Sequence, residues 1–196
     1  ELSQSCVVTV TKQIETPAVS AVLAESKDKI TVSWKTLTGA ENYILYRSND
    51  NSKYEAVTGA EYTVADQTVT FVDTNLEGGK NYYYKVQAEN KTNPSYLTSE
   101  MSAATDKIFV PILLKGITLQ AEATVELGKS AALSVTYDPA NASDKTGIWS
   151  TSNDKVATVK DGTITGVGQG TATIKFVTTD GGFEKTCTVT VVKKMA

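Results

Sequence analysis

The feature that most constrains the fold is a series of short segments in which apolar and polar residues alternate. Residues 29–34 read KITVSW and residues 81–90 read NYYYKVQAEN, with Trp34 and Tyr82 on the apolar faces. The second half alternates likewise in residues 130–137, 171–177 and 186–192. Gly, Asn, Asp and Ser bound these segments, and helical periodicity is almost absent. The sequence therefore predicts an all-β chain made of immunoglobulin-like antiparallel β-sandwiches.

The two ends of the chain carry nearly the same short strand. Residues 5–10 read SCVVTV and residues 186–191 read TCTVTV, and each copy runs on towards a lysine, Lys12 or Lys193. Self-similarity at this separation predicts tandem modules. We therefore expect the chain to be a segment of a longer modular protein.

Each copy of this strand contains one of the two cysteines, Cys6 and Cys187. Strand alternation places each thiol on the same face as the valines that follow it, so both are expected to be buried in a core as small apolar groups. A disulfide or a reactive thiol is the alternative. Two distant cysteines do not form the dense disulfide framework of a small secreted domain.

Composition excludes several classes of function. The 196 residues carry a net charge of −3 without a basic run, which argues against nucleic acid or an anionic membrane as partner. Histidine is absent, which removes the usual general base and metal ligand, so we expect no enzyme, no cofactor and no metal. The remaining acid–base candidates lie in predicted loops, and nothing in the sequence pairs them at the separation of glycosidase carboxylates: Asp138, Asp144, Asp154 and Asp161.

No segment approaches the ~20 apolar residues that span a bilayer, so direct membrane insertion is not expected. Residues 1–4 (ELSQ) do not resemble a signal peptide. If the protein is secreted, its targeting signal is expected upstream of this segment.

The first half resembles a fibronectin type III domain. The residues that carry the resemblance are the entry proline Pro17, the segment that ends in Trp34, the segment YILYR at 43–47 and the run LEGGKNYYYKVQA at 76–88. The resemblance implies that Trp34 is a core tryptophan and that Tyr82 is the corner tyrosine, whose hydroxyl bonds the backbone near Leu76. Gly78 replaces the proline that usually follows the leucine, which is a mild departure.

The second half resembles a bacterial Ig-like domain of group 2, the type found in bacterial surface adhesins. Its order of motifs is GITL at 116–119, DPANASDK at 138–145, WSTS at 149–152, GTITGV at 162–167 and CTVTV at 187–191. The resemblance implies a compact sandwich with Trp149 as its core tryptophan.

These resemblances predict the domain organisation. Residues 1–14 would be the terminal strand of a preceding Ig-like module, or an ordinary linker; residues 15–105 the fibronectin type III domain; residues 106–112 a short linker; and residues 113–196 the Ig-like domain. The linker contains no flexible Gly/Ser tract, so its apolar residues are expected to limit bending between the domains.

Two kinds of ligand site are considered. The turns at 49–52 (NDNS) and 179–182 (TDGG) could offer oxygens to calcium, but such residues are also ordinary in turns between strands. Exposed tyrosines could stack on sugar rings, and Tyr46 and Tyr83 are the candidate ligand contacts. The tyrosines that could take this role are Tyr43, Tyr46, Tyr54, Tyr62, Tyr83 and Tyr96.

Two functions remain open from the sequence, both in an extracellular or cell-surface bacterial protein. The first is a spacer and adhesion role, with partners among neighbouring domains of the same polypeptide or a host or cell-surface protein. The second is an accessory role in a secreted carbohydrate-active enzyme, with polysaccharide as partner. A phage tail decoration is a third setting. The sequence names no ligand.

Overall fold

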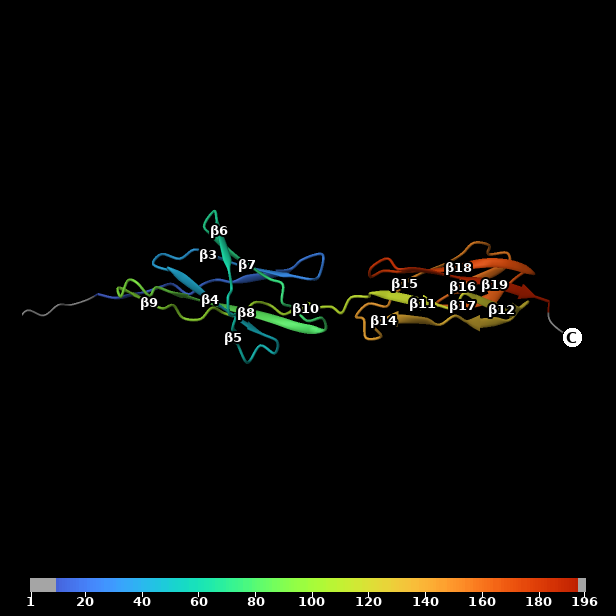
Figure 1. Ribbon diagram of the computed structural model, residues 1–196, viewed down its shortest axis with the longest axis horizontal. Coiled ribbons are helices and arrows are strands. Elements are labelled where there is room, and N and C mark those ends of the chain that lie inside the picture. Colours follow the sequence, from blue (N-terminus) through green and yellow to red (C-terminus); the bar gives the residue numbers. More distant parts are fainter. Residues whose placement is uncertain (1–9, 194–196) are drawn as a thin grey trace, which may run out of the picture. The chain divides into compact units, whose positions relative to one another are not determined.

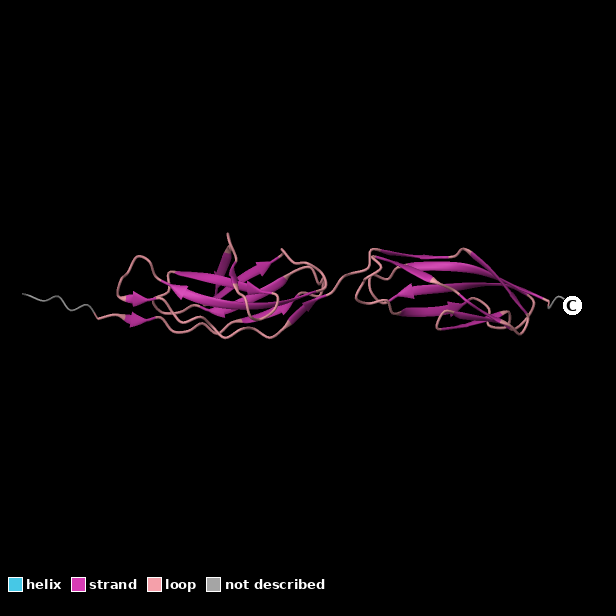
Figure 2. Ribbon diagram, turned by 90° about the horizontal axis from the view of Figure 1, so that it is seen from below, coloured by secondary structure: helices cyan, strands magenta, loops and turns pink. Residues whose placement is uncertain are grey.

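The computed structural model describes residues 10–193, and within them the chain forms strands and turns without a helix (Figures 1 and 2). The all-β prediction is therefore confirmed. Contacts divide the chain into two compact units, Glu1–Val110 and Pro111–Ala196. Most of the repeated N-terminal strand, including Cys6, lies outside the described residues, so its predicted burial and module membership stay predictions.

The first unit contains two four-stranded sheets. One sheet has the order β2-β3-β7-β6 and comprises Ser20–Leu23, Ile30–Lys35, Thr68–Asp73 and Tyr62–Ala65. The other has the order β10-β8-β4-β5 and comprises Ile108–Val110, Lys80–Glu89, Asn42–Ser48 and Glu55–Ala56. At the chain entry, β1 (Lys12–Gln13) pairs in parallel with β9 (Tyr96–Leu97).

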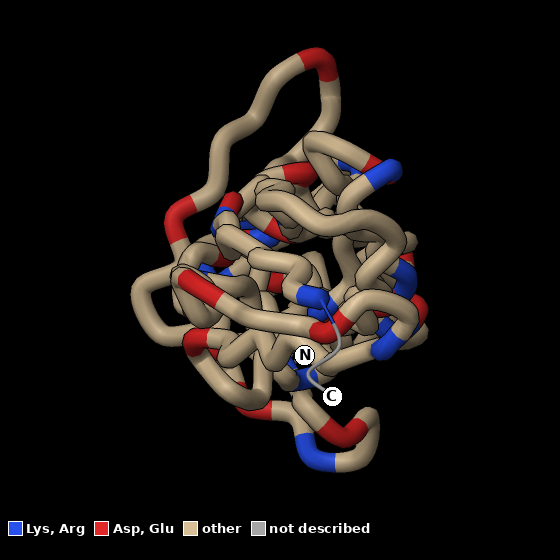
Figure 3. Tube along the Cα trace, turned by 90° about the vertical axis from the view of Figure 1, so that its right-hand side faces the viewer, with Lys and Arg blue, Asp and Glu red and all other residues tan. Residues whose placement is uncertain are grey.

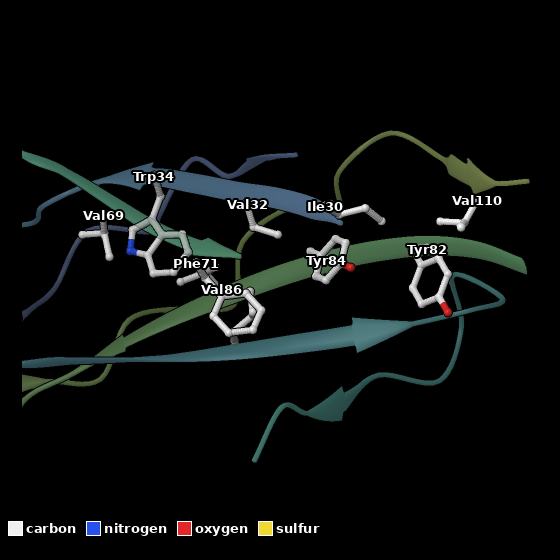
Figure 4. Close-up of a cluster of buried hydrophobic side chains, with 10 residues drawn as sticks. Ile30, Val32, Trp34, Val69, Phe71, Tyr82, Tyr84, Val86 and Val110 are labelled. Atoms are coloured by element: carbon white, nitrogen blue, oxygen red, sulfur yellow. The ribbon is translucent and has the colours of Figure 1, made fainter. Parts of the chain in front are cut away.

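The core of the first unit lies between these two sheets, where the inward residues of β3 and β7 meet those of β8 (Figure 4). The burial of every second residue along β3 and β8 follows the alternation seen in the sequence. The side chains that are completely buried in this core are Ile30, Val32, Val69, Tyr84 and Val86.

Residues 108–110 belong to the first unit and not to a free linker. They form β10, an edge strand that pairs antiparallel with β8, and the backbone N–H of Gly79 donates to the carbonyl of Val110 at 2.7 Å. Val110 is buried and joins the core, while Phe109 is 47% exposed. Pairing with β8 satisfies the backbone groups of these three residues, which fall within the predicted linker at 106–112.

The second unit contains three sheets. The largest has the order β12-β19-β18-β15 and comprises Glu122–Glu126, Glu184–Val192, Gly170–Thr178 and Gly147–Thr151. A three-stranded sheet, β13-β17-β16, comprises Ser130–Ala132, Thr163–Gly166 and Ala157–Lys160. The third pairs β11 (Gly116–Leu119) with β14 (Val135–Asp138).

One pairing in the second unit departs from a purely antiparallel sandwich. β12 pairs in parallel with the terminal strand β19, from Glu122 opposite Thr188 to Glu126 opposite Val192. Only two residues separate β12 from β11, which pairs with β14 in another sheet. The chain therefore does not reverse between β11 and β12, and β12 runs in the same direction as its partner β19.

The core of the second unit is formed by small and branched side chains from its facing strands. Ile164, Ile174, Cys187 and Val189 are completely buried there. Close packing also explains Gly162, whose φ of +78° lies in the left-handed region and where an added Cβ would approach a Trp149 ring atom to 3.3 Å.

Candidate functional site

Three half-buried tyrosines lie on the outer face of the β4–β8 sheet. Tyr46 lies opposite Lys85 on one side and Ala56 on the other, and Ser48 lies opposite Tyr83. Tyr54 precedes Ala56 by two residues, and the period of two in strands places it on the same face. We call this surface the tyrosine face: Tyr46, Tyr54 and Tyr83, with Lys85 and Gln87. The two sequence candidates, Tyr46 and Tyr83, are thus brought together.

Polar neighbours orient the rings of the tyrosine face. The Tyr46 hydroxyl donates to Gln87 Oε1 at 3.3 Å. The Lys85 ammonium lies 4.6 Å from the centre of the Tyr54 ring, within range of a cation–π contact. Burial raises the pKa of Tyr54, and the nearby Tyr83 and Asp50 raise it further. The face thus combines aromatic rings with a cation and an amide.

The other tyrosines from the sequence have structural contacts. Tyr43 and Tyr62 form an edge-on aromatic cluster with Trp34, with ring centres between 5.5 and 6.3 Å apart. Tyr96 lies over Gly39, where an added Cβ would come within 2.3 Å of the ring. These three side chains are therefore occupied in packing, which distinguishes them from the tyrosine face.

The structural residues of the first unit lie where the fibronectin resemblance implies. Trp34 is 3% exposed in the core, and its Nε1 has no hydrogen-bond partner among the described residues. Tyr82 is 2% exposed, and its hydroxyl accepts a hydrogen bond from the backbone N–H of Glu77 at 2.6 Å. The corner bond therefore falls on the residue after Leu76.

In the second unit, Cys187 is completely buried, whereas Trp149 is only partly buried. Burial raises the pKa of the Cys187 thiol, and the charge of Glu122 adds to this effect. Trp149 packs on Phe176 with ring centres 4.5 Å apart. Trp149 packs against the core but is only partly buried, because it lies on β15, an edge strand of its sheet.

A buried polar network that the sequence analysis missed lies at the end of the core. Asp73 is 2% exposed. Its carboxylate accepts a hydrogen bond from Arg47 Nη1, which lies 2.9 Å from Oδ2. It also accepts from the Tyr84 hydroxyl at 2.8 Å and from the Asn75 backbone N–H at 3.0 Å. Burial by itself would lower the pKa of Arg47, but the hydrogen bond and charge of Asp73 raise it above its ordinary value. Burial and the Asp73 charge raise the pKa of Tyr84.

An open cleft of about 830 Å³ adjoins this network, and Arg47 lines it. Its walls come from the ends of β4 and β7, from β5, and from the connection between β5 and β6. Figure 1 shows this connection in teal, running from one sheet of the first unit to the other. No sequence motif indicated the cleft, because its walls meet only through pairing across strands.

The two candidate calcium turns use their carboxylates within the fold. Asp50 Oδ1 accepts hydrogen bonds from the Ser48 hydroxyl and from the backbone N–H groups of Ser52 and Lys53. These bonds hold the pKa of Asp50 well below its usual range. Asp180 accepts from the Leu114 N–H at 2.8 Å. Among residues 10–193, no group of three or more Asp, Glu, Cys or His side chains could hold a metal ion.

The four acid–base candidates of the second unit each lie in a strand or turn of their own. Asp138 ends β14 opposite Gly116, and Asp144 accepts from the N–H and hydroxyl of Thr146. Asp154 is exposed in a turn, and Asp161 has a φ of +48° in the turn between β16 and β17. Asp138 therefore belongs to a strand and not to the predicted loop.

Charged residues of both signs are interspersed along the trace (Figure 3). None of the described residues form a helix long and apolar enough to cross a membrane.

The fold and the arrangement of sites define a pair of immunoglobulin-like sandwich modules. Comparison with known families identifies each of the two modules. Residues 19–107 match a fibronectin type III family described as the SaeA third domain, and residues 114–189 match the bacterial Ig-like domain of group 2. The chain contains a fibronectin type III domain followed by a bacterial Ig-like domain, as the sequence predicted. Such domains are typically non-catalytic modules.

Individual known proteins extend the comparison. An α-L-arabinofuranosidase of Bifidobacterium longum is 28% identical over 88% of this chain, which spans only 16% of the length of that protein. Among solved structures, a fibronectin type III-like protein from Clostridium thermocellum is 25% identical, with a TM-score of 0.36. The match covers 46% of this chain and 86% of the Clostridium chain. The surface layer protein SbsC, domains 1–6, is 16% identical with a TM-score of 0.41, covering 86% of this chain and 32% of its own.

Proposed function

We propose that these domains are non-catalytic modules of a bacterial extracellular carbohydrate-active protein, and that the first domain contacts polysaccharide through the tyrosine face. The observation that carries the proposal is the grouping of Tyr46, Tyr54 and Tyr83 on one sheet face, each partly exposed. The similarity to an arabinofuranosidase across most of the chain supports the same setting. That similarity favours the accessory role over the spacer and adhesion role.

The chemistry of the tyrosine face suits a polysaccharide chain. An aromatic ring offers a flat apolar surface with a polar edge, which complements the C–H face of a sugar ring. Tyr83 lies on β8 and Tyr54 directly precedes β5. These two strands flank β4, which places the two residues roughly 10 Å apart at the spacing of neighbouring strands. Lys85 and Gln87 supply groups for sugar hydroxyls. By analogy with the relative, the proposed ligand class is an arabinose-containing polysaccharide.

Binding to polysaccharides tests this proposal. The purified two-domain chain would be assayed against soluble and insoluble arabinan, arabinoxylan, xylan and cellulose by affinity electrophoresis and pull-down. A Tyr46→Ala/Tyr83→Ala double variant is expected to weaken binding by roughly 10- to 100-fold, because two aromatic contacts are lost.

Tyr137 offers a matched control in the second domain. It is also a partly exposed tyrosine, and the Lys145 ammonium lies 5.7 Å from its ring centre. A Tyr137→Ala variant should keep the affinity of the parent. Absence of binding by the parent to every polysaccharide, or equal losses in both variants, would overturn the proposed contact.

A spacer and adhesion role is the second candidate function. Each unit has a core of its own, which suits modules that hold other domains apart or bind a cell-surface protein. The domains encoded next to this segment decide between the candidates: a glycosidase domain supports the accessory role, and a wall anchor supports the spacer.

A further inference from the structure

The cleft between β5, β7 and the β5–β6 connection has the size of a small-molecule binding site. Its volume of about 830 Å³ lies within the range of small-molecule pockets. No residue of the tyrosine face lines it, although Lys53 and Glu55, on either side of Tyr54, do. Phe71 is 9% exposed there, and Val57 and Ala60 pack beside the core. The inner wall of the cleft thus includes apolar side chains, while most of its accessible lining is polar.

Arg47 provides hydrogen-bond donors to the cleft. All three of its hydrogen bonds within the described residues use Nη1, two to Asp73 and one to the Asn75 carbonyl at 3.0 Å. A guanidinium has five N–H donors, so those on Nε and Nη2 remain for a ligand. The side chain of Arg47 is 27% exposed in its ion pair, which leaves it accessible from the cleft.

The charges around the cleft indicate which ligand it suits. Arg47 pairs with Asp73 at 2.9 Å, and Lys53 pairs with Glu55 at 2.9 Å, so these four charges cancel in pairs. The remaining lining charges, on Asp50 and Glu61, are negative. An anionic ligand would be repelled, whereas a neutral ligand with many hydroxyls can donate to the carboxylates and accept from the guanidinium.

We propose that this cleft binds the end or a side branch of a neutral glycan, as a subsite separate from the tyrosine face. Val57 and Ala60 would contact a sugar ring, while Arg47 and Glu61 would bond its hydroxyls. The assignment goes beyond the proposed function, and only the choice of arabinose probes rests on it.

Amide chemical shifts of the intact two-domain chain test the subsite. Neutral arabino-, xylo- and gluco-oligosaccharides would be titrated to millimolar concentration, with an oligogalacturonide as the anionic comparison. We expect neutral oligosaccharides to shift the amides of residues 56–61 and 73–75. The subsite is refuted if no neutral probe shifts them, or if the anionic probe alone does.

Variants separate the subsite from the tyrosine face. Arg47→Lys keeps a positive charge for Asp73 but loses the planar fork, and is expected to weaken oligosaccharide binding by about tenfold. Glu61→Gln should weaken it less, while Glu25→Gln, an exposed glutamate in the first domain, should leave it unchanged. The melting temperature of each variant controls for folding.

The outcomes distinguish this subsite from the proposed function. Shifts in the cleft that persist in the Tyr46→Ala/Tyr83→Ala variant support a separate subsite, even if polysaccharide binding to the tyrosine face fails. Shifts confined to the tyrosine face overturn the subsite and leave the proposed function intact.

Discussion

Replacing Arg47 by methionine is expected to destabilise the first domain strongly while leaving the second unchanged. The change removes the guanidinium from Asp73, whose carboxylate is almost completely buried. Only the Tyr84 hydroxyl and the Asn75 N–H would remain as donors to it. A buried carboxylate without its counter-charge is costly, because the interior does not solvate it as water does.

The magnitude follows from the exposure of the pair. Breaking a fully buried ion pair by removing one partner costs about 3–5 kcal/mol. The Arg47 side chain is 27% exposed and that of Asp73 is 3% exposed, so some water can reach the site from the arginine side. We therefore expect a loss at the lower end of this range, about 3 kcal/mol. For a domain of this size, such a loss lowers the melting temperature by roughly 12–24 °C.

Calorimetry of the two-domain chain measures this effect, because each domain has its own core and should give its own transition. Urea unfolding followed by Trp34 fluorescence, in a Trp149→Phe background, reports on the first domain alone. The control is Arg47→Met/Asp73→Asn, in which the buried charge is removed as well and most of the stability should return. A loss below about 1 kcal/mol in the single variant, or no recovery in the double variant, would refute the reasoning.

Three further predictions concern other buried groups. Trp149→Ala should lower the free energy of unfolding of the second domain by about 2 kcal/mol, less than the loss of a fully buried tryptophan would. If the calorimetric transition of the second domain is unchanged, the packing role of Trp149 is contradicted. In a Cys6→Ser background, Cys187 should react with a thiol reagent only as fast as the second domain unfolds, since its thiol is buried and its pKa is raised; fast labelling of this variant in its native state would disprove this. The raised pKa of Tyr84 means that the folded state keeps this proton while the unfolded state loses it near pH 10, so the stability of the first domain should fall as pH rises above about 10. Urea unfolding from pH 8 to 11 should show a flatter profile for Tyr84→Phe, and equal slopes would rule out this contribution.

Alternation identified inward faces well, because a period of two fixes the side of the strand on which each residue lies. Trp34, Tyr82 and Cys187 all lie on strands with neighbours on both sides, and all are buried. Trp149 has the same kind of pattern but lies on the edge strand β15, where covering neighbours are present on one side only. Periodicity does not distinguish edge strands from central ones, so the sequence alone overestimated the burial of Trp149.

The candidate sites depended on register, which the sequence specifies only weakly. Tyr46 and Tyr83 could be named as candidates, but their grouping with Tyr54 required the pairing of β4 with both β5 and β8. The same holds for residues 108–110, whose role as a strand depends on the free edge of β8. Such pairings join residues distant in the chain, and short-range patterns do not contain them.

The polar network left a trace in the sequence that could have been used. Arg47 alternates with the buried Leu45, and Asp73 alternates with the buried Phe71, so each charge occupies an inward position of its strand. One inward charge argues against a strand assignment, but two of opposite sign on facing sheets satisfy each other. The ion pair at 2.9 Å is that solution, and it places the guanidinium at the rim of the core, where the cleft opens. An inward arginine in a strand of this sandwich therefore predicts an inward acidic partner on the facing sheet.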